Sequence, residues 1–155
     1  LPIVWNWAFL ESNNSVGVKD DNITAMTVLR HSGIVFAFNS DIWKKFKLGE
    51  LVSFNDNKTG NPALRNTVYE PQEGDMPLPP IKGIKDLQAR GSLFCVCDLA
   101  TKVYGSAVAK KMNLNPDDVY SEMVEGILPG VQLVPSGVWA LGRAQNNNCA
   151  YIFAG

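Results

Sequence analysis

Cys97 is the residue whose type and position point most directly to chemistry. It ends an apolar segment, SLFCVC (92–97), that is typical of a strand buried on both faces, and a predicted helix follows at once. The first turn of a helix carries unpaired N–H groups and a partial positive charge, and both stabilise a nucleophilic thiolate. Asp98 opposes this effect unless its carboxylate caps the helix and turns away. The alternative is a small buried side chain, which is how most free cysteines behave.

The other two cysteines are better suited to packing. Cys95 is predicted to lie one pleat deeper in the sheet, on the same face of the strand as Cys97. Burial raises the pKa of a thiol, so core packing is expected at Cys95. Cys149 begins the last predicted strand, where an exposed thiol at a sheet edge is the alternative to packing. With three cysteines and no CxxC pattern, the sequence predicts thiols and excludes a zinc ribbon or a thioredoxin-like pair.

Turn residues could form a binding site beside this cysteine. In LPGVQLVPSG (128–137), Gly130 permits a tight turn, Pro135 ends a strand and Ser136 caps the next helix. We expect the end with Pro135 and Ser136 to face the carboxyl edge of the sheet, beside Cys97. Backbone N–H groups at this end of the segment could hold an anion; the alternative is an ordinary connection between a strand and a helix.

His31 is the single histidine of the chain. We expect it near the end of a helix, where a cation complements the helix dipole; a Cys–His pair is the alternative. One histidine cannot build a multi-histidine metal site within one chain, and the sequence predicts neither a metal nor a cofactor.

Composition limits the class of protein. The chain has 155 residues, of which 46% are hydrophobic and 19% charged, as in a single globular domain. Its 14 basic and 15 acidic side chains give a net charge of −1, without the basic excess of a nucleic-acid-binding protein. No apolar run approaches the ~20 residues of a membrane-spanning helix.

Hydrophobic patterning predicts five strands that alternate with helices. The expected strands are 1–10, 34–38, 92–97, 131–134 and 149–154, and the expected helices are 22–30, 41–46, 81–89, 99–112, 115–123 and 136–146. This order predicts a three-layer α/β fold, with a mainly parallel five-stranded sheet and helices on both faces.

One long segment interrupts this pattern. Residues 47–80 are rich in Gly, Asn, Asp and Pro, and we expect them to form a loop insertion within a single domain, 1–155. The insertion is either a surface feature, which could pack on a neighbouring subunit, or a lid over a site.

The second half of the chain resembles a known family. GSLFCVC, the helix after it and LNPDDVY, GILPGVQLVPSGVWALGRAQ and AYIF are similar to the corresponding stretches of the DsrE/DsrF-like family of small sulfur-relay proteins. The resemblance covers residues 81–153, whereas the first half fits only by its predicted topology. It implies a flavodoxin-like sheet, a homo-oligomer (often a trimer or hexamer) and, in the sulfurtransferase members, a cysteine in this region that carries a persulfide.

We therefore expect a sulfur carrier or sulfurtransferase with Cys97 as persulfide carrier and a donor or acceptor protein as partner. The alternative is a non-catalytic oligomeric binding or structural subunit, in which Cys97 is a core thiol. The resemblance also extends to a subgroup with exported precursors. A removed export signal would account for a chain that begins at Leu1 inside an apolar stretch, so a periplasmic or other exported location is expected.

Overall fold

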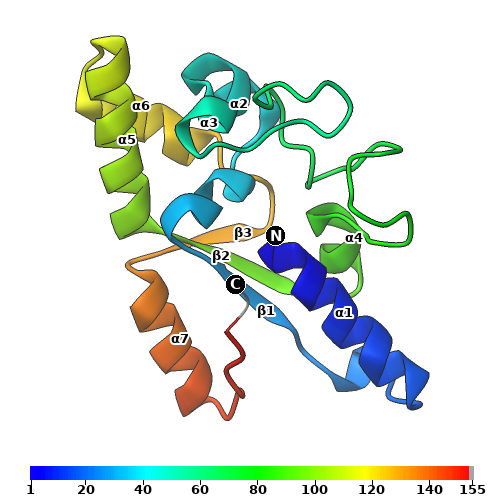
Figure 1. Ribbon diagram of the computed structural model, residues 1–155. Coiled ribbons are helices and arrows are strands. Elements are labelled where there is room, and N and C mark those ends of the chain that lie inside the picture. Colours follow the sequence, from blue (N-terminus) through cyan, green and yellow to red (C-terminus); the bar gives the residue numbers. More distant parts are fainter. Residues whose placement is uncertain (154–155) are drawn as a thin grey trace.

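A three-stranded parallel sheet lies at the centre of the computed structural model, which describes residues 1–153 (Figure 1). The strands are β1 (Met26–Leu29), β2 (Leu93–Cys97) and β3 (Val131–Val134). β2 lies in the middle and pairs Val96 with Leu29 of β1 and Cys97 with Val134 of β3. Because all three strands run in the same direction, the residues that follow them meet at one edge, called the carboxyl edge below.

Helices cover both faces of this sheet. In chain order they are α1 (Pro2–Ser15), η1 (Asp20–Asn22), η2 (His31–Ala37), α2 (Ser40–Phe46), α3 (Leu48–Leu51), α4 (Ile84–Ala89), α5 (Asp98–Met112), α6 (Pro116–Glu125) and α7 (Gly137–Asn146). α7 contacts all three strands and lies on the opposite side of the sheet from η2, α5 and α6 (Figure 1). The fold is therefore α/β with a parallel sheet, as expected.

The prediction of a five-stranded sheet was wrong, because three of the expected strand positions hold no strand in the described part of the chain. Residues 1–10 belong to α1, and residues 34–38 lie mostly in η2. Residues 149–153 form no strand, and Ala154, the end of that predicted strand, lies outside the described residues. Conversely, a strand occurs where a helix was expected: residues 22–30 contain the end of η1 and the whole of β1.

The buried positions of α1 follow a helical spacing. Pro2 occupies the first turn, where its missing N–H costs nothing, and Ile3, Asn6 and Leu10 are buried on one face. The Asn6 amide donates to Thr27 Oγ1 at 3.0 Å and accepts from Ser92 Oγ at 2.7 Å, so every partner in this buried network is satisfied. An apolar run of ten residues with this burial has no alternation that would identify a strand.

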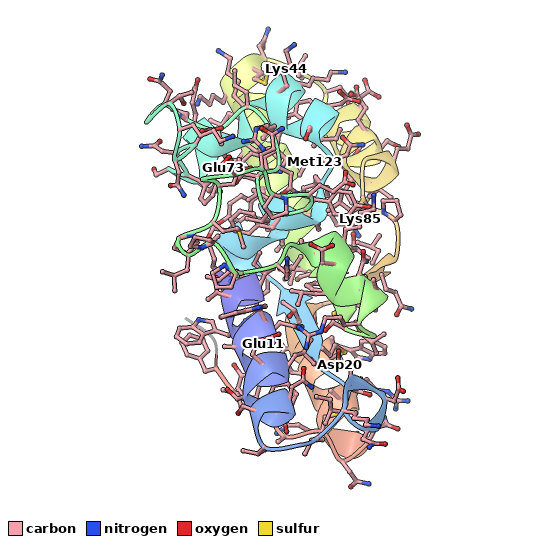
Figure 2. The ribbon with its side chains drawn as sticks, turned by 90° about the vertical axis from the view of Figure 1, so that its right-hand side faces the viewer. Glu11, Asp20, Lys44, Glu73, Lys85 and Met123 are labelled. Atoms are coloured by element: carbon pink, nitrogen blue, oxygen red, sulfur yellow. The ribbon has the colours of Figure 1, made fainter. Side chains whose placement is uncertain are left out.

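An ion-pair cluster holds the far end of α1. The guanidinium of Arg90, directly after α4, lies 2.6 Å from Glu11 of α1 and 2.7 Å from Asp20 of η1. Figure 2 shows these two carboxylate-bearing residues near the same end of the molecule. The cluster joins three segments that are far apart in the chain.

β1 shows the alternating burial of a half-covered strand. Met26 is exposed, Thr27 is buried, Val28 is intermediate and Leu29 is buried. β-Branched residues in this segment favour an extended backbone over a helix. These β-branched residues were the sequence signal for a strand within 22–30, where a helix was expected.

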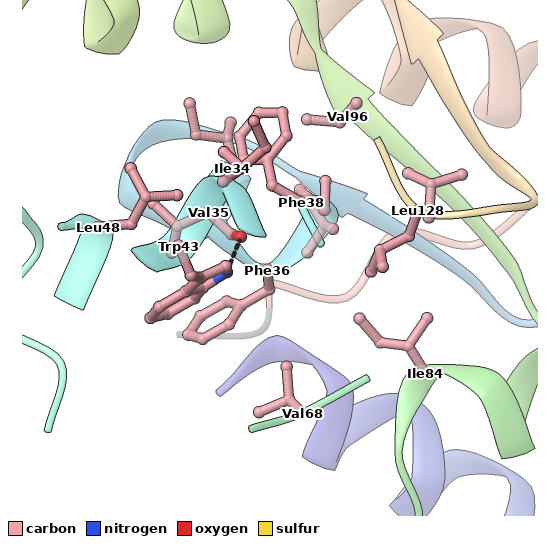
Figure 3. Close-up of a cluster of buried hydrophobic side chains, with 14 of the residues drawn as sticks. Ile34, Val35, Phe36, Phe38, Trp43, Leu48, Val68, Ile84, Val96 and Leu128 are labelled. Atoms are coloured by element: carbon pink, nitrogen blue, oxygen red, sulfur yellow. Dashed lines mark hydrogen bonds between the residues drawn. The ribbon is translucent and has the colours of Figure 1, made fainter. Parts of the chain in front are cut away.

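η2 forms the centre of the core rather than a strand. Ile34, Val35, Phe36, Ala37 and Phe38 are all buried (Figure 3). A continuous apolar run has no period that separates a strand from a buried helical turn, which explains the wrong prediction here.

An aromatic cluster completes this part of the core. The indole N–H of Trp43, on α2, donates to the carbonyl oxygen of Val35 at 2.8 Å (Figure 3). The ring of Phe36 packs against those of Trp43 and Phe54, with centroids 5.8 and 5.2 Å apart. These contacts bind η2 to α2 and to the segment that follows α3.

The later elements follow the sequence patterns closely. Two predicted strands are present: 92–97 is β2 and 131–134 is β3. Five predicted helices are also present: 41–46 is α2, 81–89 is α4, 99–112 is α5, 115–123 is α6 and 136–146 is α7. Asn39, Asn115 and Ser136 each accept a hydrogen bond from a first-turn backbone N–H, so local capping marks these starts.

The 47–80 insertion contributes side chains to the core of its own chain. Ala63 and Val68 are buried, and the buried Asn66 amide donates to the carbonyl oxygens of Phe36 and Phe38 at 2.9 and 2.8 Å. Arg65 and Asp75 form a bidentate ion pair within the segment. The insertion is thus an anchored part of the fold, with α3 as its one helix among the described residues.

Over the described residues, no helix combines the length and the apolar character that crossing a bilayer requires.

Candidate functional site at the carboxyl edge

Four of the predicted site residues follow the three strands at the carboxyl edge. His31 comes after β1, Asp98 after β2, and Pro135 and Ser136 after β3. Cys97, the last residue of β2, pairs with Val134 and so lies next to the turn that contains Pro135. The register therefore confirms that this turn and the cysteine are neighbours.

Cys97 is the N-cap residue of α5. Its Sγ accepts a hydrogen bond from the backbone N–H of Ala100 at 3.3 Å, and its carbonyl oxygen accepts from Thr101 Oγ1 at 3.0 Å. The sulfur thus takes the position that a serine or aspartate oxygen usually takes at a helix start. The residue is only 6% exposed and packs within the main hydrophobic cluster.

The carboxylate of Asp98, the next residue, is bound by two side chains. One oxygen accepts from the Tyr120 hydroxyl on α6 at 2.8 Å, and the other lies 2.7 Å from the Lys102 ammonium, one turn along α5. These two partners satisfy the carboxylate, and the lysine neutralises its charge.

Ser136 caps α7, as expected: its Oγ accepts from the backbone N–H of Trp139 at 3.1 Å. Directly after it, Gly137 is buried against Arg30, because a Cβ at this position would lie 3.1 Å from the Cβ of that arginine. Arg30 therefore lies at the carboxyl edge beside the start of α7. Arg30 was not expected at this edge, because the sequence predicts it inside a helix, whereas it directly follows β1.

Two of the predicted positions differ from expectation. Gly130 lies at the amino end of β3, opposite the carboxyl edge, where its φ of 74° forms a turn against Gln88 of α4. It does not contribute to the site. His31 is the first residue of η2 rather than the end of a helix, and it is exposed with a φ of 50°. No hydrogen bond between described residues joins His31 to Cys97, so a Cys–His pair is not formed.

The three thiols occupy different environments. Cys95 and Cys97 are buried and Cys149 is exposed, and all three are free. Burial, with a smaller contribution from the neighbouring Cys97, raises the pKa of Cys95 to about 11. Cys95 packs with Val134 and Ala140 beneath α7, which makes it a core residue as expected.

These environments predict an order of thiol alkylation. At pH 8 a thiol with a pKa of about 11 is ionised in about one molecule in a thousand, so Cys95 should stay unmodified while iodoacetamide labels Cys149. Peptide mapping of the folded protein after a short labelling time measures this order. Unfolding in guanidinium should make all three cysteines react at similar rates, and equal labelling of Cys95 and Cys149 in the folded state would contradict the assignment.

Within residues 1–153, no three His, Cys, Asp or Glu side chains come together as ligands for a metal ion. The groups that the carboxyl edge brings together are a thiol at a helix start and, next to it in the chain, a carboxylate paired with a lysine.

No protein-family model, no curated protein and no solved structure matches this chain.

Proposed function

We propose that this protein is a sulfur carrier of the DsrE/DsrF-like kind and that Cys97 holds the transferred sulfur as a persulfide. The observation that carries the proposal is the hydrogen bond from the Ala100 N–H to Cys97 Sγ at the start of the 15-residue helix α5. A sulfur anion at this position is stabilised by the unpaired N–H groups and the partial positive charge of the helix.

The transfer needs no oxidant and no cofactor. The Cys97 thiolate attacks the terminal sulfur of a donor persulfide, R–S–SH. An S–S bond forms to Cys97, the donor's S–S bond breaks, and the donor leaves as the thiolate R–S⁻ with the electron pair of that bond. Attack by an acceptor thiolate on the terminal sulfur reverses the process and regenerates Cys97. The partners would be a donor protein and an acceptor protein.

A second function is favoured by a different observation. Cys97 is buried among the side chains of the main core, which suits a packing residue as well as a carrier. The protein would then be a non-catalytic binding or structural subunit that assembles with copies of itself.

Intact mass spectrometry separates the two functions. The protein is incubated with glutathione persulfide, and the wild type is compared with Cys97→Ser and with the matched controls Cys95→Ser and Cys149→Ser. We expect the mass of one sulfur atom to be added to the wild type and both controls, to disappear with dithiothreitol, and to be absent from Cys97→Ser.

Sulfur that is lost only in Cys149→Ser would overturn the proposal, since it would report an exposed thiol without a site. An absence of added sulfur, together with a Cys97 that resists iodoacetamide in the folded protein, would favour the non-catalytic subunit.

A further inference from the structure

The start of α5 offers its N–H groups to two competing acceptors. Asp98 is the first residue of the helix and follows Cys97 directly. A carboxylate in the first turn is attracted to the same free N–H groups and partial positive charge that attract the sulfur. If Asp98 bonded to these groups, it would displace the sulfur and place a negative charge beside it.

In the structure, two side chains bind the Asp98 carboxylate instead. The Tyr120 hydroxyl donates to one oxygen of Asp98 at 2.8 Å, and the Lys102 ammonium lies 2.7 Å from the other. The ammonium also lies 5.3 Å from the centroid of the Tyr120 ring, so the three groups form one cluster between α5 and α6. Asp98 and Lys102 lie in the first two turns of α5, and Tyr120 lies on α6.

The protonation states suit this cluster. The hydrogen bond to Asp98, and then burial, raise the pKa of Tyr120, so its phenol remains a donor at neutral pH. The same carboxylate raises the pKa of Lys102, which therefore stays charged.

We propose that Tyr120 is a positioning residue for the sulfur site: with Lys102 it holds the Asp98 carboxylate on the α6 side and leaves the Ala100 N–H to Cys97 Sγ. The inference rests on the proposed function in that this sulfur is the one that carries the transferred atom. Tyr120 itself touches neither the sulfur nor the Ala100 N–H in any hydrogen bond of the described residues.

The test is Tyr120→Phe, which removes only the hydroxyl. We expect the initial rate of sulfur loading from glutathione persulfide at pH 7 to fall about tenfold, the size of effect that follows loss of a charge-assisted hydrogen bond. The Ala100 amide proton should also shift in a ¹⁵N-correlated NMR spectrum as its acceptor changes. Tyr104→Phe is the matched control, because Tyr104, on α5, packs against the core and has no hydrogen bond to Asp98 among the described residues.

Asp98→Asn is a second variant, and it tests whether removing the carboxylate abolishes the effect of Tyr120→Phe. Without the carboxylate there is no charged competitor, so loss of the Tyr120 hydroxyl should have no further effect in this background: the double variant Tyr120→Phe/Asp98→Asn should load sulfur at the same rate as Asp98→Asn. A purely structural role of the hydroxyl would make the double variant about tenfold slower than Asp98→Asn.

The outcomes distinguish this inference from the proposed function. Wild-type loading in Tyr120→Phe with an unchanged Ala100 amide would overturn the positioning role and leave the persulfide carrier intact. A wild-type protein that takes up no sulfur would end the carrier proposal. The Ala100 amide would still test the positioning role: a shift in Tyr120→Phe that Asp98→Asn reverses supports it, and no shift overturns it.

Discussion

Replacement of Asp75 by alanine should lower the free energy of unfolding by about 3 kcal/mol, because it leaves the Arg65 guanidinium without its main partner in a partly buried site. The Asp75 side chain is fully buried, and its oxygens lie 2.6 and 2.9 Å from the guanidinium. One of these oxygens also accepts from the backbone N–H of Gln72 at 2.6 Å. The pair thus fixes two turns of the 47–80 insertion against each other.

Chemical denaturation at pH 7 measures this loss. Glu73→Ala is the matched control, since Glu73 is an exposed acid in the same turn and its loss should change stability by less than about 0.5 kcal/mol. The double variant Arg65→Leu/Asp75→Leu should recover part of the loss, because it removes both charges. Equal stabilities of Asp75→Ala and Glu73→Ala would show that the pair contributes nothing.

The same pair makes stability depend on pH. Burial alone would raise the pKa of Asp75, but the hydrogen bonds from Arg65 and from the Gln72 N–H outweigh it and lower that pKa. A carboxyl whose pKa is lower in the folded state stabilises the fold above its unfolded pKa, near 4, and this contribution is lost as the pH falls further. The stability difference between wild type and Asp75→Asn should therefore shrink between about pH 5 and pH 2.

Gly49→Ala should also destabilise the protein by about 3 kcal/mol, the upper part of the range for overpacking. A Cβ at Gly49 would lie 2.4 Å from both the backbone nitrogen and the carbonyl oxygen of Ala63. The Gly49 carbonyl oxygen accepts from Phe54 N at 2.8 Å, and Ala63 N donates to Phe54 O at 3.0 Å. The added methyl group would have to push this hydrogen-bonded backbone away from α3, because no flexible side chain can give way.

Gly142→Ala is the matched control for this substitution. Gly142 lies in α7 with open space where its Cβ would point and without a positive φ. Alanine there should stabilise the helix by about 0.5–1 kcal/mol, so the two variants should move the thermal midpoint in opposite directions. A Gly49→Ala midpoint at or above the wild-type value would show that the close contact with Ala63 is absent in solution.

Local signals in the sequence determined much of the second half of the fold. Pro116 in the first turn of α6, the Ser136 cap of α7 and the apolar run 92–97 each act within a few residues, so their effect can be predicted without knowing the rest of the molecule. The position of Cys97 between a strand and a helix start follows from the same local patterns.

Tertiary structure decided the conformation of much of the first half of the chain and the surroundings of the candidate site. Residues 1–10 and 34–38 are apolar without a clear period, so packing against the sheet and against Trp43, rather than propensity, sets their conformation. Asn66 anchors the 47–80 insertion to carbonyl oxygens about 30 residues earlier in the chain. No local sequence pattern predicts these hydrogen bonds.

The candidate site divides in the same way. The helix-start position of Cys97 and the capping role of Ser136 each follow from residues close by in the chain. The burial of its sulfur and the direction of the Asp98 carboxylate depend on partners from other elements, above all on Tyr120, 22 residues further along. Capping is a local hydrogen bond, whereas burial and charge neutralisation arise only when distant segments pack together.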